Sequence, residues 1–341
     1  MRIIFAISIT ILIPLFMACE KLMIEKDPDN SPENNFELLW NIIDRNYSFF
    51  EYKNINWDSI KHIYQPKIND SMTNRQLFDV MSDMLFELRD GHVNLYWGTE
   101  RSKNWDWYSD YPANFNYNLL EANYINKETG SIGPFQTASL DSIGYIYCGT
   151  FAERIRESEI DIIIDNFQDM KGIIIDVRNN TGGYSVNGTI IASRFADSMR
   201  LASYTLYKTG PGHGDFSQPQ PNYISPEGEK QFLKPVVVLT NRRTFSAAND
   251  FVLTMTSLPG VKVIGDKTGG GGGTPYDYEL LNGWRCRFPR TQTLSPDKFN
   301  VEKGIPPFIH VNMNVQDEIR GMDTIIERAI NYLKRSFSES V

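Results

Sequence analysis

The chain has 341 residues, of which 41% are hydrophobic, 13% aromatic and 22% charged. This composition is typical of a folded globular protein and excludes disordered, collagen-like and coiled-coil chains. The 34 basic against 42 acidic residues give a net charge of −8, so the whole-chain balance lacks the basic footprint that nucleic-acid binding needs, and we expect no nucleic-acid partner.

The first 18 residues have the features of a secretory signal peptide. Arg2 precedes an uncharged, mostly apolar run that is too short for a comfortable transmembrane helix and ends at Ala18. The segment Phe16-Met17-Ala18-Cys19 resembles the lipobox of a bacterial lipoprotein, which implies cleavage after Ala18 and lipidation of Cys19. The alternatives are ordinary secretion, with Cys19 lost in the discarded peptide, or a retained N-terminal anchor.

Lipidation of Cys19 predicts a location in the bacterial cell envelope. A polar tether over 19–35 would hold the folded part at a membrane, on its periplasmic side or at the cell surface. The membrane is then a partner through the lipid anchor. In that compartment Cys148 and Cys286 either form a disulfide or remain two buried thiols.

The N-terminal part of the mature chain predicts a small helical domain over 36–97. Apolar residues recur at helical spacing from Phe36 to Tyr47 and again from Leu77 to Leu88. The second run follows a Thr-x-x-Gln capping box that begins at Thr73. Residues 98–142 are rich in Trp, Tyr, Asn and Asp with little periodicity, so we expect connecting strands and loops there.

From Ile143 onward, short apolar runs alternate with helical stretches. This order implies right-handed crossovers and a largely parallel sheet covered by helices, which makes 143–341 an α/β core. The expected strands cover 143–148, 172–177, 235–240, 261–265, 276–289 and 308–313, and the expected helices cover 153–169, 187–199, 247–258 and 318–335.

Two loops that follow expected strands are candidate reactive sites, because such sheets bind ligands at the carboxyl ends of their strands. The first, Asp176–Gly183, has paired glycines that let backbone amides face a ligand, although a polar turn is the simpler interpretation. In the second, Ser246 lies at the start of a helix, where free N–H groups favour developing negative charge. The ordinary interpretation of a serine there is a helix N-cap.

A nucleophilic serine needs a general base, and histidine is the side chain best matched to neutral pH. His62 lies on a solvated helix pattern, and His310 lies in an expected strand. His213 lies in a glycine-rich loop that could approach a site. His92 follows Gly91, where a helix pattern ends.

Five segments together resemble the tail-specific, or C-terminal-processing, serine protease family. LRDGHVNL, GIIIDVRNNTGG, TFSAAND, VIGDKTGG and VEKGIPPFIHV occur in the family's order and approximate spacing, within residues 36–311. The resemblance implies a ClpP/crotonase-like catalytic core and a serine endopeptidase that cleaves peptide or protein substrates through an acyl-enzyme. We expect no cofactor, and no motif for a metal site is present.

The resemblance also implies roles for particular residues. Ser246 would be the nucleophile, and the backbone amide of Ala247 with that of Gly182 or Gly183 would form the oxyanion hole. The tricorn-like branch of the family uses a histidine oriented by a glutamate, and His92 and Glu302 match those positions. Gly91 stands where tricorn has a serine in its site.

Two alternatives remain at this point, one for the general base and one for the function, and one domain common in the family is not expected. Many relatives use a lysine base in Thr-x-Gly-Lys-Gly; this chain has glycine there, which leaves Lys267 as a fallback. About fifty residues separate His92 from Ile143, too few for the PDZ domain of many members, so none is expected. The competing function is a catalytically inactive lipoprotein that binds peptides or glycans in the same cleft. The oligomeric state is not indicated by the sequence.

Overall fold

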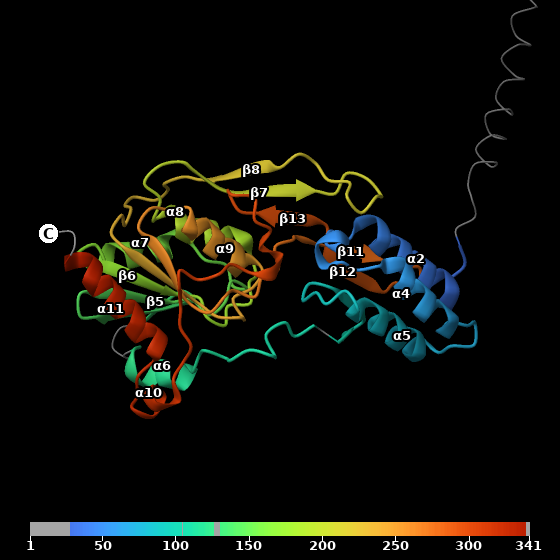
Figure 1. Cartoon of the computed structure of the whole chain (residues 1–341), viewed down its shortest axis with the longest axis horizontal. Helices are drawn as coiled ribbons and strands as arrows, with labels where there is room; N and C mark the ends of the chain where they lie inside the picture. The colour runs from blue at the N-terminus through green and yellow to red at the C-terminus, as the bar shows by residue number, and fades with distance from the viewer. Residues whose placement is uncertain (1–27, 104, 126–129, 339–341) are drawn as a thin grey trace, which may run out of the picture.

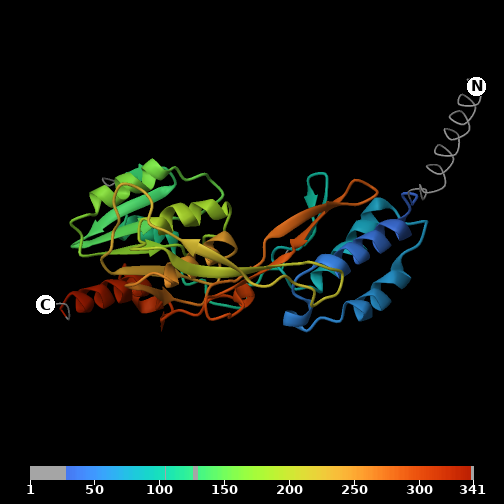
Figure 2. The same ribbon diagram turned by 90° about the horizontal axis from the view of Figure 1, so that it is seen from above.

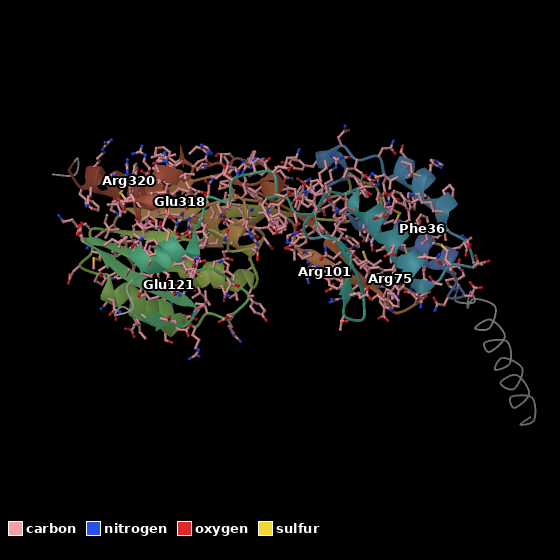
Figure 3. All side chains as sticks on the ribbon, turned by 90° about the horizontal axis from the view of Figure 1, so that it is seen from below. Phe36, Arg75, Arg101, Glu121, Glu318 and Arg320 are labelled. Atoms are coloured by element: carbon pink, nitrogen blue, oxygen red, sulfur yellow. The ribbon has the colours of Figure 1, made fainter. Side chains whose placement is uncertain are left out.

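The computed structural model describes residues 28–103, 105–125 and 130–338. The expected signal peptide and Cys19 lie outside this part of the chain. The described residues form a mainly helical lobe and an α/β core that lie end to end (Figure 1, Figure 2). In Figure 3 the labels Phe36, Arg75 and Arg101 mark the helical lobe, and Glu121, Glu318 and Arg320 mark the core.

Helix α2 (Pro32–Asn46) starts the helical lobe. The Ser31 side chain caps its first turn and Pro32 occupies that turn, so the helix takes in the end of the expected 19–35 tether. Phe36 and Ile43 are fully buried, as their spacing predicts. The capping box expected before residue 77 is present at the start of α5. The other helices of the lobe are α3 (Phe50–Lys53), α4 (Trp57–Tyr64), the 3₁₀ helix η1 (Gln65–Lys67) and α5 (Asn74–Phe86).

The helical lobe also contains an antiparallel sheet with the strand order β11-β12-β1-β2. Two of its strands come from 275–289, a segment that we expected to complete the core. The reason is burial, since Trp284, Cys286 and Phe288 pack with the apolar faces of the lobe's helices. The strands are β1 (Asn94–Trp97), β2 (Glu100–Arg101), β11 (Pro275–Glu279) and β12 (Arg285–Pro289).

The core is built on a seven-stranded sheet with the order β14-β10-β9-β6-β5-β4-β3. The five strands from β5 to β14 are parallel, as predicted, and β4 and β3 add an antiparallel edge. That edge comes from residues expected to be connecting segments. The strands are β3 (Ser131–Ile132), β4 (Phe135–Leu140), β5 (Ile143–Tyr147), β6 (Gly172–Asp176), β9 (Val236–Thr240), β10 (Val261–Gly265) and β14 (Ile309–His310).

Helices cover both faces of this sheet. Along β6, Ile173 and Ile175 pack with α7 (Glu157–Asn166), α8 (Ser185–Ser193) and α9 (Ala247–Thr256), whereas Ile174 packs with the opposite layer. The opposite layer consists of α6 (Tyr117–Asn123) and α11 (Thr324–Ser338). The helix expected at 318–335 is two helices, because Gly321 turns the chain with a φ of 78° after α10 (Val315–Ile319).

A third, antiparallel sheet has the order β13-β7-β8 and lies over α8 and α9 (Figure 1). Its strands are β7 (Arg200–Tyr207), β8 (Gln220–Ile224) and β13 (Thr291–Leu294). The loop after β7 reaches the helical lobe, where His213 stacks on Phe50 and contacts Asp44 at 2.9 Å. His213 is therefore held between the lobes.

Cys148 and Cys286 are free and buried, and they lie in different hydrophobic cores. Of the two states that the sequence left open, the structure shows two thiols. Burial raises the pKa of the Cys148 thiol to about 12. Within the described ranges, no helix combines the length and the apolar character needed to cross a membrane.

Candidate active site

The two predicted strand-end loops meet at the carboxyl edge of β6 and β9. Asn179 donates its backbone N–H to Asn241 Oδ1 at 3.0 Å, and Asn241 Nδ2 donates to Asn179 Oδ1 at 2.8 Å. Phe245 donates its N–H to the carbonyl of Asn180 at 3.0 Å. The asparagines thus hold one loop against the other.

The charged residues of the first loop support the fold. Arg178 is fully buried and bonds Asp176 at 2.6 Å and Asp323 at 2.9 Å. Asp323 precedes α11, so this cluster ties the loop to the C-terminal helix. The guanidinium of Arg178 therefore pairs with carboxylates inside the core and supports the fold.

Ser246 does not cap the helix that follows it. Its backbone has φ 56° and ψ −127°, and its side chain makes no capping hydrogen bond. A non-glycine residue in this conformation is strained by about 1–3 kcal/mol. The Ser246 N–H donates to the Gly270 carbonyl at 2.9 Å, which helps to hold the turn. The N-cap interpretation is therefore wrong, and the hydroxyl is directed elsewhere.

The Ser246 hydroxyl contacts His92, which lies 154 positions earlier in the chain. Its Oγ is 2.9 Å from His92 Nε2. His92 follows α5 and precedes β1, and its backbone N–H donates to Asp90 Oδ1 at 2.8 Å. The ring of Phe245 lies against the imidazole with a centroid distance of 4.7 Å. The two residues that the sequence paired are thus in hydrogen-bond contact.

The imidazole of His92 is partly buried. Burial lowers the pKa of His92 to about 4, with Asp90 opposing this shift and Arg287 adding to it. The ring is therefore neutral at pH 7 and able to accept a proton. Its second nitrogen, Nδ1, is buried and has no hydrogen-bond partner among the described residues.

Glu302 does not contact His92, which corrects the expected carboxylate–imidazole pair. Its Oε1 lies 2.8 Å from Lys53 Nζ, and its Oε2 accepts a hydrogen bond from Gly272 N–H at 3.0 Å. Burial raises the pKa of Glu302 to about 7, against the opposing charge of Lys53. The physical reason for the difference is that Lys53, a buried cation, takes the carboxylate.

Lys53 joins two carboxylates beside the imidazole. Its Nζ also lies 2.8 Å from Asp90 Oδ2, to which Tyr47 donates its hydroxyl at 2.8 Å. Burial acts to raise the pKa of Asp90, but the charges of Lys53 and His92 and the hydrogen bonds from both residues together outweigh it, so the pKa lies below its ordinary value. We name this set, Lys53, Asp90 and Glu302, the carboxylate bridge. Sequence reasoning missed Lys53, since a lysine at the end of a short helix carries no motif.

The glycine run at 269–273 fills the space between the bridge and the imidazole. A Cβ on Gly271 would lie 3.0 Å from His92 Cε1 and 2.5 Å from the ring of Phe245. A Cβ on Gly270 would lie 1.9 Å from the Glu302 carbonyl oxygen. Both glycines have positive φ values, 84° for Gly270 and 78° for Gly271. The run is thus a packed wall of the site.

The predicted oxyanion donors are adjacent to Ser246. A Cβ on Gly182 would lie 2.8 Å from Ser246 Cβ and 3.0 Å from Ala247 N, which shows how closely the two loops approach. The Gly182 N–H already donates to Asn180 Oδ1 at 3.0 Å. Among the described contacts the N–H groups of Gly183 and Ala247 have no acceptor. Of the two glycines, Gly183 therefore has the available amide.

Gly91 lies where a side chain would collide with Trp107. A Cβ there would be 2.4 Å from that indole ring, which stacks on Phe245 at a centroid distance of 3.7 Å. Trp107 Nε1 also donates to the Arg242 carbonyl at 2.7 Å. The position of the tricorn serine is thus closed by an aromatic residue from the segment 98–142.

The other candidate bases lie apart from Ser246. Lys267 lines a cavity of about 610 Å³ that Trp107 and Phe245 border, and among the described residues no hydrogen bond joins it to Ser246 or His92. Burial, with nearby cations, lowers the pKa of Lys267. His62 is exposed, and His310 lies 3.5 Å from Asp266. Over the described ranges, no group of three His, Cys, Asp or Glu residues could hold a metal.

The comparisons with known proteins fit this geometry. Residues 142–311 match peptidase family S41, and residues 28–86 match the tricorn protease C1 domain. A crystal structure from Parabacteroides merdae, assigned as a peptidase, has 43% sequence identity and a TM-score of 0.84, and the match covers 89% of this chain and 97% of that one. The chain belongs to peptidase family S41.

More distant relatives of this S41 chain agree with the fold. The carboxy-terminal processing protease CtpA of Bacillus subtilis is 27% identical over 176 residues, which cover 51% of this chain and 36% of the relative. The chain therefore spans about a third of the length of that curated relative. The photosystem II D1 C-terminal processing protease has 15% identity and a TM-score of 0.56, covering 87% of this chain and 97% of its own. The expected fold class is confirmed.

Proposed function

We propose that this S41 chain is a serine endopeptidase that cleaves peptide or protein substrates through an acyl-enzyme. The observation that supports it most is the 2.9 Å contact between Ser246 Oγ and His92 Nε2. A strained serine between two loops with free amides, beside a neutral imidazole, has the parts that acyl transfer needs. Family membership agrees with this assignment.

The reaction follows from these positions. Ser246 Oγ attacks the peptide carbonyl carbon while His92 Nε2 takes the hydroxyl proton, and the amides of Ala247 and Gly183 bind the oxyanion. The C–N bond then breaks, and His92 gives the proton to the leaving amine. A water molecule attacks the acyl-enzyme by the same route, which releases the second product and restores Ser246.

Glu302 completes the proposed Ser–His–Glu set as a positioning residue. Its carbonyl accepts from Gly271 N–H at 3.1 Å and its carboxylate from Gly272 N–H at 3.0 Å. Gly271 packs against the ring of His92. Glu302 therefore acts on the imidazole indirectly, through the glycine wall and Lys53. In this proposal the glutamate of the tricorn-like site keeps a positioning role without contacting the histidine.

Labelling by a fluorophosphonate probe, together with cleavage of a mixed peptide library, tests this function. Wild-type protein should label and cleave, and Ser246→Ala should do neither. Ser257→Ala, at the other end of α9, is the matched control and should keep both activities. A protein that binds peptides but neither labels nor cleaves would instead support the inactive binding lipoprotein. Cleavage by Ser246→Ala at the wild-type rate would refute the nucleophile.

We further propose that the protein is a lipoprotein of the cell envelope, anchored through Cys19. The supporting observation is the lipobox-like sequence before a polar stretch that leads to α2. Full-length protein made in bacteria should fractionate with membranes and incorporate labelled palmitate. Cys19→Ala should lose the label. Equal palmitate labelling of both proteins would contradict the anchor.

A further inference from the structure

A second cavity, of about 520 Å³, lies between α8, α9 and the three-stranded sheet. α8 packs against α9 and β8, and α9 packs against β7 (Figure 1). Most of the lining side chains are small or carry a hydroxyl group. Ser185, Gly188, Thr205, Thr254 and Thr274 are among them.

The chain segments that wall this cavity continue directly from those that build the reaction site. Ser185 follows Gly183 by two positions, and Thr274 follows the glycine wall. A Cβ on Gly188 would lie 3.7 Å from the Ala247 carbonyl oxygen, so α8 touches the first turn of α9. Two lining residues, Gly188 and Asp250, therefore lie directly against Ala247 and Ser246 of the reaction site.

Among the described residues that line the cavity, Asp250 is the one with a charged side chain. Its Oδ1 atom is buried and has no hydrogen-bond partner among the described residues. Burial raises the pKa of Asp250 to about 7, with no neighbouring charge contributing. Asp250 as a whole is half-buried, but its buried Oδ1 is unfavourable in the charged form without a partner, so a ligand that supplied a cation or donor to this atom would be favoured.

The distance from Ser246 suits a long side chain. Asp250 lies one helical turn after Ser246, and its N–H donates to the Ser246 carbonyl at 3.0 Å. Four residues of helix span about 6 Å along the axis. An extended lysine or arginine side chain, with bonds of about 1.5 Å, covers a similar length. The hydroxyls of Ser185, Thr205 and Thr254 would surround its charged end.

We propose that this cavity receives the substrate side chain that precedes the cleaved bond, and that Asp250 selects lysine or arginine there. The proposal rests on the proposed endopeptidase function. An apolar side chain of the same length would leave the carboxylate unpaired, so discrimination arises from the unpaired group as well as from the new ion pair.

The experiment compares kcat/KM for peptides that differ only in that residue. Lysine, arginine, norleucine and leucine are tested, since norleucine keeps the length of lysine without its charge. We expect wild type to favour lysine over norleucine by roughly ten- to hundredfold. Asp250→Asn should abolish this preference, so that its kcat/KM values for the lysine and norleucine peptides lie within about threefold of each other. Asp58→Asn, an exposed aspartate of the helical lobe, should behave as wild type.

A second readout does not depend on turnover. Ser246→Ala should bind the lysine peptide more tightly than the norleucine peptide in calorimetry, and Ser246→Ala with Asp250→Asn should bind the two equally. Labelling and cleavage by wild type without a basic preference, or a preference kept in Asp250→Asn, would overturn the cavity assignment alone. Absence of labelling and of cleavage of every peptide would overturn the proposed function together with it.

Discussion

Glu302 and His92 make different kinds of contact, so their substitution should have different effects. Glu302→Gln keeps an acceptor for Gly272 N–H and loses the charge opposite Lys53. We expect kcat to fall by about tenfold or less, since an acid bound directly to a catalytic histidine is worth about 10⁴-fold. In His92→Ala, kcat should fall by at least about 10⁴-fold. Steady-state kinetics on one peptide measures both.

Thermal unfolding of each variant distinguishes a loss of catalysis from a loss of folded protein. A Glu302→Gln enzyme as inactive as His92→Ala, with an unchanged Tm, would mean that the carboxylate reaches the imidazole during turnover. In that case the arrangement that the structure shows would be a resting one.

The acid side of the pH–rate profile reports on the environment of His92. A free imidazole has a pKa near about 6.5, and burial lowers that of His92 to about 4. Only the neutral ring can accept the Ser246 proton, so kcat/KM on a peptide with leucine before the cleaved bond should keep most of its plateau value at pH 6. Asp90 raises the pKa of His92, so Asp90→Asn should move the acid limb to still lower pH.

Glu302→Gln is the control for this profile, because burial raises the pKa of the Glu302 carboxyl to about 7. A limb that disappears in this variant belongs to Glu302. A limb that stays at or above about pH 6.5 would show that the imidazole titrates as it does in water.

The sequence predicted the reacting pair better than its support. Ser246 and His92 were paired from motif order, and they lie in contact. The prediction that Glu302 contacts the imidazole directly was wrong, because Glu302 forms an ion pair with Lys53. Lys53 lies 249 positions from Glu302, on a short helix that carries no chemical motif. The Trp107 indole over Gly91 was missed for a similar reason, since residues 98–142 have no periodicity to place them.

At the scale of elements, the glycine wall offers a matched pair of substitutions. Gly271 and Gly283 both have a φ of 78°, so alanine would introduce backbone strain at both positions. A Cβ at Gly271 meets Phe245 and His92, whereas the nearest atom to one at Gly283 is 4.0 Å away. Gly271→Ala should lower kcat by about a hundredfold through displacement of the imidazole. Gly283→Ala should keep wild-type kcat.

The two variants should have similar Tm values if strain alone changes stability, so kinetics and unfolding are measured on the same samples. Wild-type activity in Gly271→Ala would show that the wall does not position His92. A loss of activity in Gly283→Ala would mean that backbone strain alone disturbs the enzyme.

The regular elements of the core could be predicted because their signals are local. The parallel strands from 143 to 265 were predicted from β-branched runs within a few residues of their observed ends. The lobe to which strands β11 and β12 belong could not be predicted. Trp284 and Phe288 are apolar, and their pattern alone fits the hydrophobic core of either lobe. Sheet partners are chosen by tertiary packing, which sequence periodicity does not encode.

At the scale of the whole molecule, the candidate active site lies where the lobes meet. His92, Asp90 and Lys53 come from the helical lobe, and Ser246 and Glu302 come from the core. Figure 1 shows the two lobes lying end to end, with extended segments running between them. The carboxylate bridge is thus both a support for the imidazole and a contact between lobes.

Lys53→Met should test this double role. Removing the cation leaves Asp90 and Glu302 buried without their shared partner, which should destabilise the fold by about 3–5 kcal/mol at pH 8. Without Lys53 the folded-state pKa of Asp90 rises above the unfolded value and that of Glu302, already raised, rises further, so the folded state binds more protons. Stability lost at pH 8 should therefore return as the pH falls toward about 5. Thermal unfolding of wild type and variant at several pH values measures this.

Lys61→Met is the matched control, because Lys61 pairs with the partly exposed Glu37 on the surface of the same lobe. A surface pair is worth about 0–1 kcal/mol, so its loss should change Tm little at any pH. If Lys53→Met lost no more stability than Lys61→Met, or lost it equally at pH 5 and pH 8, the bridge would not hold the lobes together. The recovery of stability at low pH is the decisive feature. If Lys53 only filled space, its replacement would lower the stability by the same amount at every pH.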